Sequence, residues 1–156
     1  SSDLLTLVAA ALGAAAPGAL AADMTLPSGW SSREGVSVDT AGASMVISST
    51  DTRNVIKWDS FSIGKDASVL FSGSGHKYLN LVSGGRPSNL DGVLLGGLND
   101  VYLVNPAGIT MGLNSAAVAS SLALITAQPT DEAIEAFRTH GSLELSGLRG
   151  QGGSRF

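Results

Sequence analysis

Short runs of aliphatic and β-branched residues alternate with clusters of Gly, Asn, Asp and Ser between residues 54 and 112. Apolar residues at helical spacing are absent there, whereas short strands bounded by turn residues give this pattern. The runs are residues 55–56, 69–71, 79–82 and 101–104. Apolar centres follow no exact repeat and lie near Ile56, Val69, Leu81, Leu94, Leu103 and Ile109. The pattern predicts stacked coils of short strands joined by tight turns.

The segment before this stretch, residues 24–53, predicts a cap. Val36 and Val38 alternate with polar residues, and Met45 and Ile47 do so further on. This alternation predicts two or three short strands. The open end of a stack of strands exposes unpaired backbone groups and is a template for aggregation. We therefore expect this segment to cover the first coil.

The segment after residue 112 is mixed in character. Residues 115–127 read SAAVASSLALITA and fit either a helix or a buried strand. Thr130 is a good N-cap, acidic residues follow it, and Gly141 suits a helix end, so a short helix is predicted over residues 131–138. Polar and apolar residues alternate again over 142–146, which predicts one more strand.

Residues 4–22 are apolar and rich in Ala, and they end in small residues. Ala19-Leu20-Ala21 before Ala22 fits the small-x-small rule for cleavage of a signal peptide. The positively charged start of such a peptide is not present, so residues 1–22 are interpreted as a truncated signal peptide. The mature chain would then begin at Ala22 or Asp23. The alternative is a buried N-terminal helix.

Composition narrows the function classes. Only 14% of residues are charged, against about 25% in a typical soluble domain. The net charge is −4 and the nine basic residues are scattered, so no nucleic acid binding is expected. The chain has no cysteine, which excludes disulfides and thiolate metal sites.

Candidate chemistry is sparse. His76 and His140 lie beside Gly, outside any metal-ligand spacing, so both are expected on the surface and no metal or cofactor site is predicted. Single carboxylates in or beside turns are expected to cap those turns. They are Asp51, Asp59, Asp66, Asp91 and Asp100. A β-helical polysaccharide-active enzyme, which would pair carboxylates from adjacent coils, stays an alternative.

Two aromatic residues, Trp58 and Phe61, lie three positions apart. In one strand this spacing places them on opposite faces, so one is expected in the core and the other half-exposed. Stacking on carbohydrate is the alternative role for the exposed ring.

The most distinctive turn is Asn105-Pro106-Ala107-Gly108. Proline fixes φ at the first corner of a turn, and glycine two positions later accepts a positive φ. The side chain of Asn105 can cap the turn. The residues alone therefore predict a well-formed corner.

The stretch resembles the secretion domain of filamentous-haemagglutinin-type exoproteins, the passengers of two-partner secretion. The family's turn reads Asn-Pro-Asn-Gly-Ile, and here it is Asn105-Pro106-Ala107-Gly108-Ile109, with Ala107 in place of the second Asn. The resemblance covers roughly residues 25–145. It also takes in Trp58, Phe61, Ile63-Gly64, Leu79-Asn80, Pro87-Ser88 and Gly92.

The resemblance implies an all-β fold, a right-handed parallel β-helix with an N-terminal antiparallel cap and one short helix. It favours a strand over a helix for residues 115–127. Residues 23–156 would be the secretion domain, cut from a larger exoprotein. The implied partner-recognition residues are Asn105, Pro106, Gly108, Ile109, Leu79 and Asn80.

The implied function is not enzymatic. The domain would target a large adhesin or haemagglutinin to its outer-membrane pore and nucleate β-helix folding outside the cell. The implied partner is the set of periplasmic domains of that pore, and the passenger would bind host or bacterial surfaces. The location would be the exterior or surface of a diderm bacterium, reached through the periplasm. A self-standing surface adhesin module is the further alternative.

Overall fold

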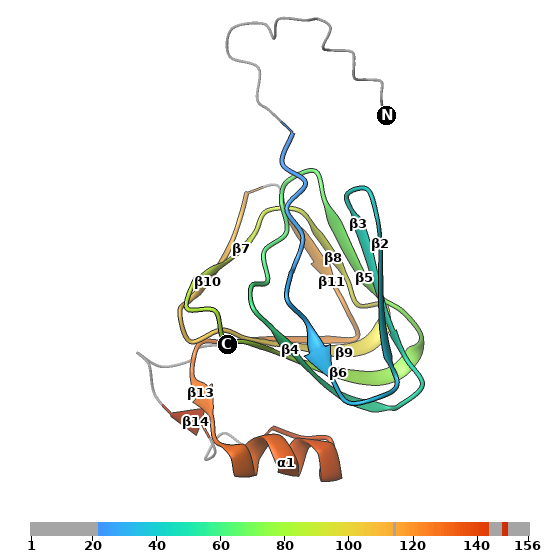
Figure 1. Cartoon of the computed structure of the whole chain (residues 1–156), viewed down its shortest axis with the longest axis vertical. Helices are drawn as coiled ribbons and strands as arrows, with labels where there is room; N and C mark the ends of the chain where they lie inside the picture. The colour runs from blue at the N-terminus through green and yellow to red at the C-terminus, as the bar shows by residue number, and fades with distance from the viewer. Residues whose placement is uncertain (1–21, 114, 144–147, 150–156) are drawn as a thin grey trace, which may run out of the picture.

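The computed structural model describes residues 22–113, 115–143 and 148–149. Short strands form a stack that is triangular in cross-section, with one helix outside it (Figure 1). The strands are β1 (Ser31–Ser32), β2 (Val36–Ala41), β3 (Ser44–Ser49), β4 (Arg53–Trp58), β5 (Ser68–Phe71), β6 (Ser74–Val82), β7 (Ser88–Leu90), β8 (Val93–Leu95), β9 (Leu98–Val104), β10 (Ile109–Met111), β11 (Ala116–Val118), β12 (Ser121–Ile125), β13 (Gln128–Pro129) and β14 (Leu148–Arg149); the helix is α1 (Asp131–His140).

Three faces make up the stack. The helix-side sheet has the strand order β1-β4-β6-β9-β12, and the cap-side sheet has the order β2-β3-β5-β8-β11. Between them lies the short face, in which β10 pairs with β7 and a parallel bridge joins Ile63 to Leu90. From β3 and β4 onward all neighbours in the three faces pair in parallel. The predicted parallel β-helix is confirmed.

The core fills the triangle because alternate residues of each strand point inward. Met45 and Ile47 of β3 are buried, as are Val69 and Phe71 of β5. These pairs meet in register, Met45 beside Val69 and Ile47 beside Phe71. Burial of such side chains contributes about 1.5–3 kcal/mol each. The predicted alternation in the cap therefore places its apolar residues in the shared core.

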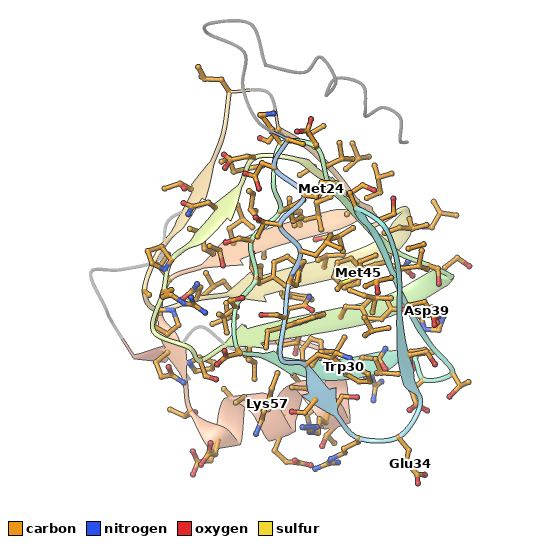
Figure 2. All side chains as sticks on the ribbon, turned by 45° about the horizontal axis from the view of Figure 1, so that its top comes forward. Met24, Trp30, Glu34, Asp39, Met45 and Lys57 are labelled. Atoms are coloured by element: carbon orange, nitrogen blue, oxygen red, sulfur yellow. The ribbon has the colours of Figure 1, made fainter. Side chains whose placement is uncertain are left out.

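The N-terminal cap consists of antiparallel strands, as predicted. β2 and β3 form a hairpin, and β1 pairs antiparallel with β4. Met45 of this hairpin is buried and Asp39 is exposed (Figure 2). One antiparallel strand thus covers the N-terminal edge of each long sheet, which protects backbone groups that would otherwise invite pairing.

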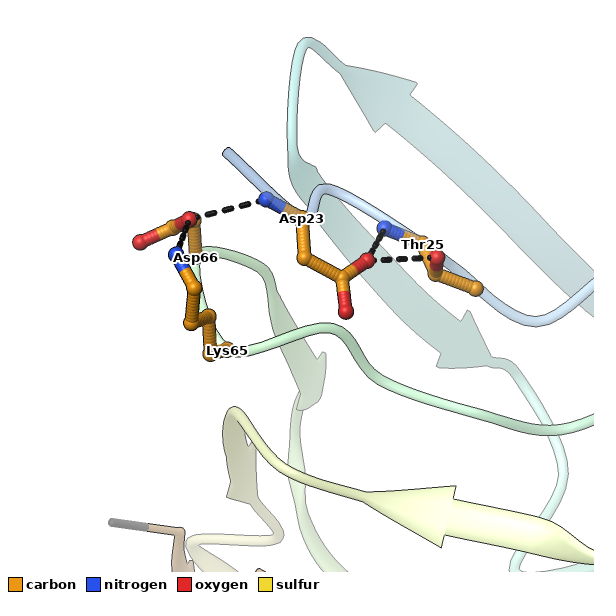
Figure 3. A network of polar contacts seen from close by, with 4 residues as sticks. All are labelled: Asp23, Thr25, Lys65 and Asp66. Atoms are coloured by element: carbon orange, nitrogen blue, oxygen red, sulfur yellow. Dashed lines mark hydrogen bonds and ion pairs between the residues drawn. The ribbon is translucent and has the colours of Figure 1, made fainter. Parts of the chain in front are cut away.

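The start of the described chain is fastened to the first coil (Figure 3). The backbone N–H groups of Gly64 and Asp66 donate to the carbonyl oxygens of Thr25 and Asp23, each over 2.9 Å. In return, the Asp23 N–H donates to Asp66 Oδ2 over 2.9 Å. Lys65 Nζ donates to the same oxygen over 2.7 Å, and this bond lowers the pKa of Asp66. Asp66 therefore holds the start of the described chain against the first coil, instead of serving only as a turn cap as the sequence suggested.

Helix α1 covers the outer face of the helix-side sheet (Figure 1). Phe137 is fully buried there and lies edge-on to Tyr102, with 5.3 Å between ring centroids. Thr130 Oγ1 accepts from the Ala133 N–H over 3.1 Å, and Gly141 ends the helix at φ 77°. The predicted helix is confirmed and runs two residues past its expected end. In the described part of the chain, no helix is long and apolar enough to cross a membrane.

Positively charged side chains of the first two coils hydrogen-bond to the last turn of α1. Arg53 Nη1 donates to the carbonyl oxygen of Thr139, and Lys77 Nζ donates to that of Gly141 over 2.7 Å. Positive charge at a helix C-terminus is favourable because the last carbonyl groups carry partial negative charge. These contacts join segments that are far apart in the sequence.

Backbones come close together where the cap-side sheet begins. A Cβ atom on Gly92 would lie against the carbonyl oxygens of Gly64 and Ala67, nearer than real Cβ atoms come. A Cβ atom on Gly64 would meet the Asp23 carbonyl, and one on Gly112 would meet Asp91. We call Gly64, Gly92 and Gly112 the glycine corner. It allows successive coils to stack with backbone against backbone.

Three expectations are corrected or refined. Trp58 and Phe61 are both buried, because Phe61 lies beyond the end of β4 and strand alternation does not extend to it. Residues 115–127 form strands, β11 and β12. The strand predicted over 142–146 is not formed at positions 142 and 143, and positions 144–146 lie outside the described residues; a strand occurs later, as β14. Of the predicted signal peptide, only Ala22 is described.

Candidate functional site

The predicted turn forms at the corner between β9 and β10. The Gly108 N–H donates to the Asn105 carbonyl over 3.0 Å, which closes a turn with Pro106 at its first corner. Gly108 has a φ of 122°, as the sequence predicted, and its carbonyl accepts from the Ser88 N–H over 2.9 Å. Ile109 then starts β10 in register with Ser88. The turn thus directs the chain into the short face.

The side chain of Asn105 ties this turn to the coil below. Its Nδ2 donates to the Arg86 carbonyl over 2.9 Å and to Ser88 Oγ over 3.0 Å. Its Oδ1 accepts from the Ala107 N–H over 2.9 Å, which is the capping bond that the sequence predicted. The Asn105 N–H donates to the Ile125 carbonyl on the next coil over 2.8 Å. Asn105 is buried with its hydrogen-bonding groups paired, as a buried amide requires.

Asn80 links three successive coils from inside the triangle. Its Oδ1 accepts from Trp58 Nε1 over 2.9 Å, and its Nδ2 donates to the carbonyl oxygens of Tyr102, over 3.0 Å, and Tyr78, over 3.3 Å. Asn80 is fully buried. Its neighbour Leu79 points to the opposite face of β6 and packs beneath α1. Leu79 and Asn80, which are adjacent in the sequence motif, therefore lie in different places: Leu79 in the apolar cluster beneath α1 and Asn80 inside the triangle.

Two further buried asparagines were missed by the sequence reasoning. Asn99 Nδ2 lies 2.9–3.2 Å from the carbonyl oxygens of Phe71, Ser72, Gly73 and Gly96, and its Oδ1 accepts from the His76 N–H over 3.0 Å. Asn54 makes a smaller set of bonds at the start of β4. One sequence signal could have identified them: each is an Asn next to a short run of β-type apolar residues, as Asn80 is also.

The structure separates the predicted site residues by accessibility. Leu79 and Asn80 are fully buried, and Asn105 is 1% exposed. Pro106, Gly108 and Ile109 are half-buried, and Ala107 between them is exposed. A cavity of about 210 Å³ beside the turn is lined by Val82, Ser83, Gly85, Asn105, Pro106, Ala107 and Gln128. In the folded domain a partner reaches the rim of the turn but not the side chains of Asn80 and Asn105.

Ionisable residues do not gather at this site. Among the described residues, no three His, Asp or Glu side chains are close enough to share a metal ion. His140 is exposed at the end of α1, as expected. His76 is different from the expectation: it lies within β6, is half-buried, and its Nδ1 is 2.6 Å from the Asp51 carbonyl. Its place is fixed by the neighbouring coil.

Parallel coils, an antiparallel cap and asparagines buried within the coils define a small β-solenoid domain. The model of the family described as TPS secretion domain matches residues 21–148. The chain therefore belongs to the family of two-partner secretion domains.

Among solved structures, the chain is similar to the HMW1 secretion domain from Haemophilus influenzae, with a TM-score of 0.64 and 25% sequence identity. The similarity covers 70% of this chain and 30% of that chain. Comparison with curated proteins gives no match. The predicted resemblance is confirmed, and with it the role as the secretion domain of an exoprotein that a two-partner transporter exports through the outer membrane.

Proposed function

We propose that the transporter recognises this domain through its own periplasmic domains and does so while the chain is unfolded. The burial of Leu79, Asn80 and Asn105 carries this proposal. Side chains inside a folded core cannot be read by a partner, whereas an extended chain presents all of them. Such a chain can add to the edge of a receptor sheet, where backbone hydrogen bonds give affinity and alternate side chains give specificity.

Folding outside the cell then drives export in one direction. Each coil buries apolar residues against the one before it, as Val69 does beside Met45. Buried apolar area contributes about 25 cal/mol per Å², so each added coil makes return through the pore less favourable. The domain acts as the first folded segment of a larger exoprotein, whose passenger would be an adhesin or haemagglutinin. We expect no hydrolase activity from the domain itself.

The test compares two states of the same chain on immobilised periplasmic domains of the cognate transporter. We expect chain freshly diluted from urea to bind at least about tenfold more tightly than refolded chain, a difference of about 1.4 kcal/mol. Unfolded chain of an unrelated protein of equal length is the control. Equal binding by the folded and unfolded states would contradict recognition of the unfolded chain.

A separate prediction concerns processing. We expect the exported protein to begin at Ala22 or Asp23, because small residues precede this point and Asp23 is hydrogen-bonded to the first coil. N-terminal sequencing of the secreted protein measures this directly. Recovery of secreted protein that retains residues 4–21 would show that the apolar segment is not a signal peptide.

A further inference from the structure

Basic residues that lie far apart in the sequence come together beside α1. A cavity of about 340 Å³ opens between the end of β1, the outer face of β4 and the helix. Lys57 extends from the stack on the side of α1 (Figure 2). Among the described residues, the lining consists of Ser31, Ser32, Arg33, Val55, Lys57 and Arg138. Three of these residues are positively charged and none is negatively charged, so we call this space the cationic cavity.

A second cavity, of about 180 Å³, adjoins the cationic cavity and shares Arg33 and Arg138 with it. It adds Arg53, whose guanidinium already donates to the last turn of α1, and the carboxylates of Glu34 and Asp51. Positive charge without a carboxylate in the lining is thus confined to the cationic cavity. The carboxylates beside it repel a long polyanion, so the site suits a single compact anionic group.

Arg138 is the most buried of the three cations, with 19% of its side chain exposed. Glu135 Oε1 lies 3.9 Å from its Nε and 3.7 Å from Nη2 of Arg33. Both distances are too long for a hydrogen bond. Each guanidinium group carries five N–H donors. Within the described part of the chain, neither group has a hydrogen-bonded acceptor, so the donors of both remain available to a ligand.

The fold holds like charges close together in this cavity. Burial lowers the pKa of Arg138, and the nearby charge of Arg33 lowers it further. The two guanidinium groups share one carboxylate, that of Glu135. The ammonium group of Lys57 has no ion pair with any described residue. An anion bound between these three side chains would offset their repulsion, because an opposite charge close by favours the charged form of each.

We propose that the cationic cavity binds the phosphate group of a ligand. A phosphate monoester carries about −1.5 to −2 charges at pH 7 and has three strong acceptor oxygens, which matches three cations that approach from three elements. The planar fork of an arginine can bind two of these oxygens at once, and a lysine adds a point charge. A carboxylate has only two oxygens and one charge.

The site exists only in the folded domain. Arg33 follows β1, Lys57 lies on β4 and Arg138 lies on α1, so the three cations meet only after the first coil and the helix have come together. The proposal therefore does not depend on how the transporter recognises the unfolded chain. A bound phosphate would add to the contacts that hold α1 on the stack, because a ligand that binds only the folded state stabilises it.

The first measurement titrates the full chain with inorganic phosphate at constant ionic strength, because salt screens exposed charges. The NMR chemical shifts of the Ser32 and Lys57 amides report binding. We expect saturable shifts, and an affinity at least about tenfold lower for Arg138→Gln, because hydrogen bonds between charged groups are the strong ones. Arg86→Gln is the matched control: it removes the same charge from an exposed position outside the lining and should leave the affinity unchanged.

A second variant keeps the test independent of the packing of Arg138 beside the helix. Arg33→Gln combined with Lys57→Gln changes two exposed side chains and removes two of the three cations. We expect this variant also to bind phosphate at least about tenfold more weakly. Far-UV circular dichroism checks that each variant folds. Phosphate binding that this double variant retains in full would overturn the proposal, and so would acetate binding of equal strength to the unchanged chain.

Vesicles distinguish two sources of such a phosphate group. The full chain is sedimented with vesicles of phosphatidylcholine alone and with equimolar phosphatidylcholine and phosphatidic acid, which exposes a phosphate monoester. Residues 4–22 are the same in every variant, so the difference between variants reports the cavity. Extra sedimentation with phosphatidic acid that Arg138→Gln loses and Arg86→Gln keeps assigns the phosphate to a lipid headgroup. Binding of inorganic phosphate without such sedimentation assigns it to a soluble phosphate ester. A chain that shows neither effect overturns the proposal.

Discussion

Gly92→Ala is expected to prevent stable folding of the domain. The added Cβ atom would meet the carbonyl oxygens of Gly64 and Ala67, which are backbone atoms and cannot rotate away. The coils would have to separate at the glycine corner, next to the core. We expect the free energy of unfolding to fall by more than about 3 kcal/mol, a large share of the 5–15 kcal/mol that holds a typical domain together. Urea unfolding followed by fluorescence of the buried Trp58 measures this.

Gly42→Ala is the matched control for this substitution. Gly42 lies between β2 and β3 with a φ of 59°, and a Cβ atom there would meet no atom within 4 Å. Its cost is therefore backbone strain alone, about 1–2 kcal/mol. Gly92 has no such strain, so its effect reports the close approach of the coils. A Gly92→Ala chain at least as stable as Gly42→Ala would show that the corner is looser than described.

The second large effect is expected from Asn105→Ala combined with Gly108→Val, which should block secretion. Val at a φ of 122° costs about 1–2 kcal/mol in strain. Loss of the Asn105 amide leaves the Arg86 carbonyl and Ser88 Oγ without this partner, at a further cost of about 1–3 kcal/mol. Secretion is measured as the amount of protein in the culture medium of cells that carry the transporter.

The control pair is Asn89→Ala with Gly42→Val. It changes the same residue types and also strains a positive φ, of 59°, but the Asn89 side chain is exposed and Gly42 lies away from the turn. We expect this chain to be secreted.

Binding of the unfolded double mutant to the periplasmic domains then separates two causes. Normal binding means that the turn acts through folding outside the cell, and lost binding means that the turn belongs to the recognised signal. If the Asn105→Ala, Gly108→Val variant is secreted as efficiently as wild type, the turn is not part of the functional site.

Local patterns gave much of the fold. Alternation identified the inward residues Met45 and Ile47, and the capping residues Thr130 and Gly141 placed the helix. Such signals work because partners lie within one strand or one helical turn. The burial of Phe61 was missed because it depends on the path of the chain after β4 ends.

The site shows the same limit. The turn at Asn105 could be predicted from Pro106 and Gly108, because a turn is a local structure. The role of Asn99 could not, since its four carbonyl partners include three from the preceding coil. The sequence also grouped Leu79 with Asn80, although strand geometry turns adjacent side chains to opposite faces.

The contacts of Arg53 and Lys77 with the end of α1 imply an order in which parts of the domain fold. Coil-to-coil pairs join residues close in the sequence, such as Asn54 with Tyr78 and Tyr78 with Val101, so each coil can form once its predecessor exists. The bond from Arg53 to Thr139 spans 86 residues. In a chain that emerges from its N-terminus, the outer face of the first coil would stay uncovered until the helix arrives, so closure of that face would mark the moment when the chain as far as Gly141 is outside.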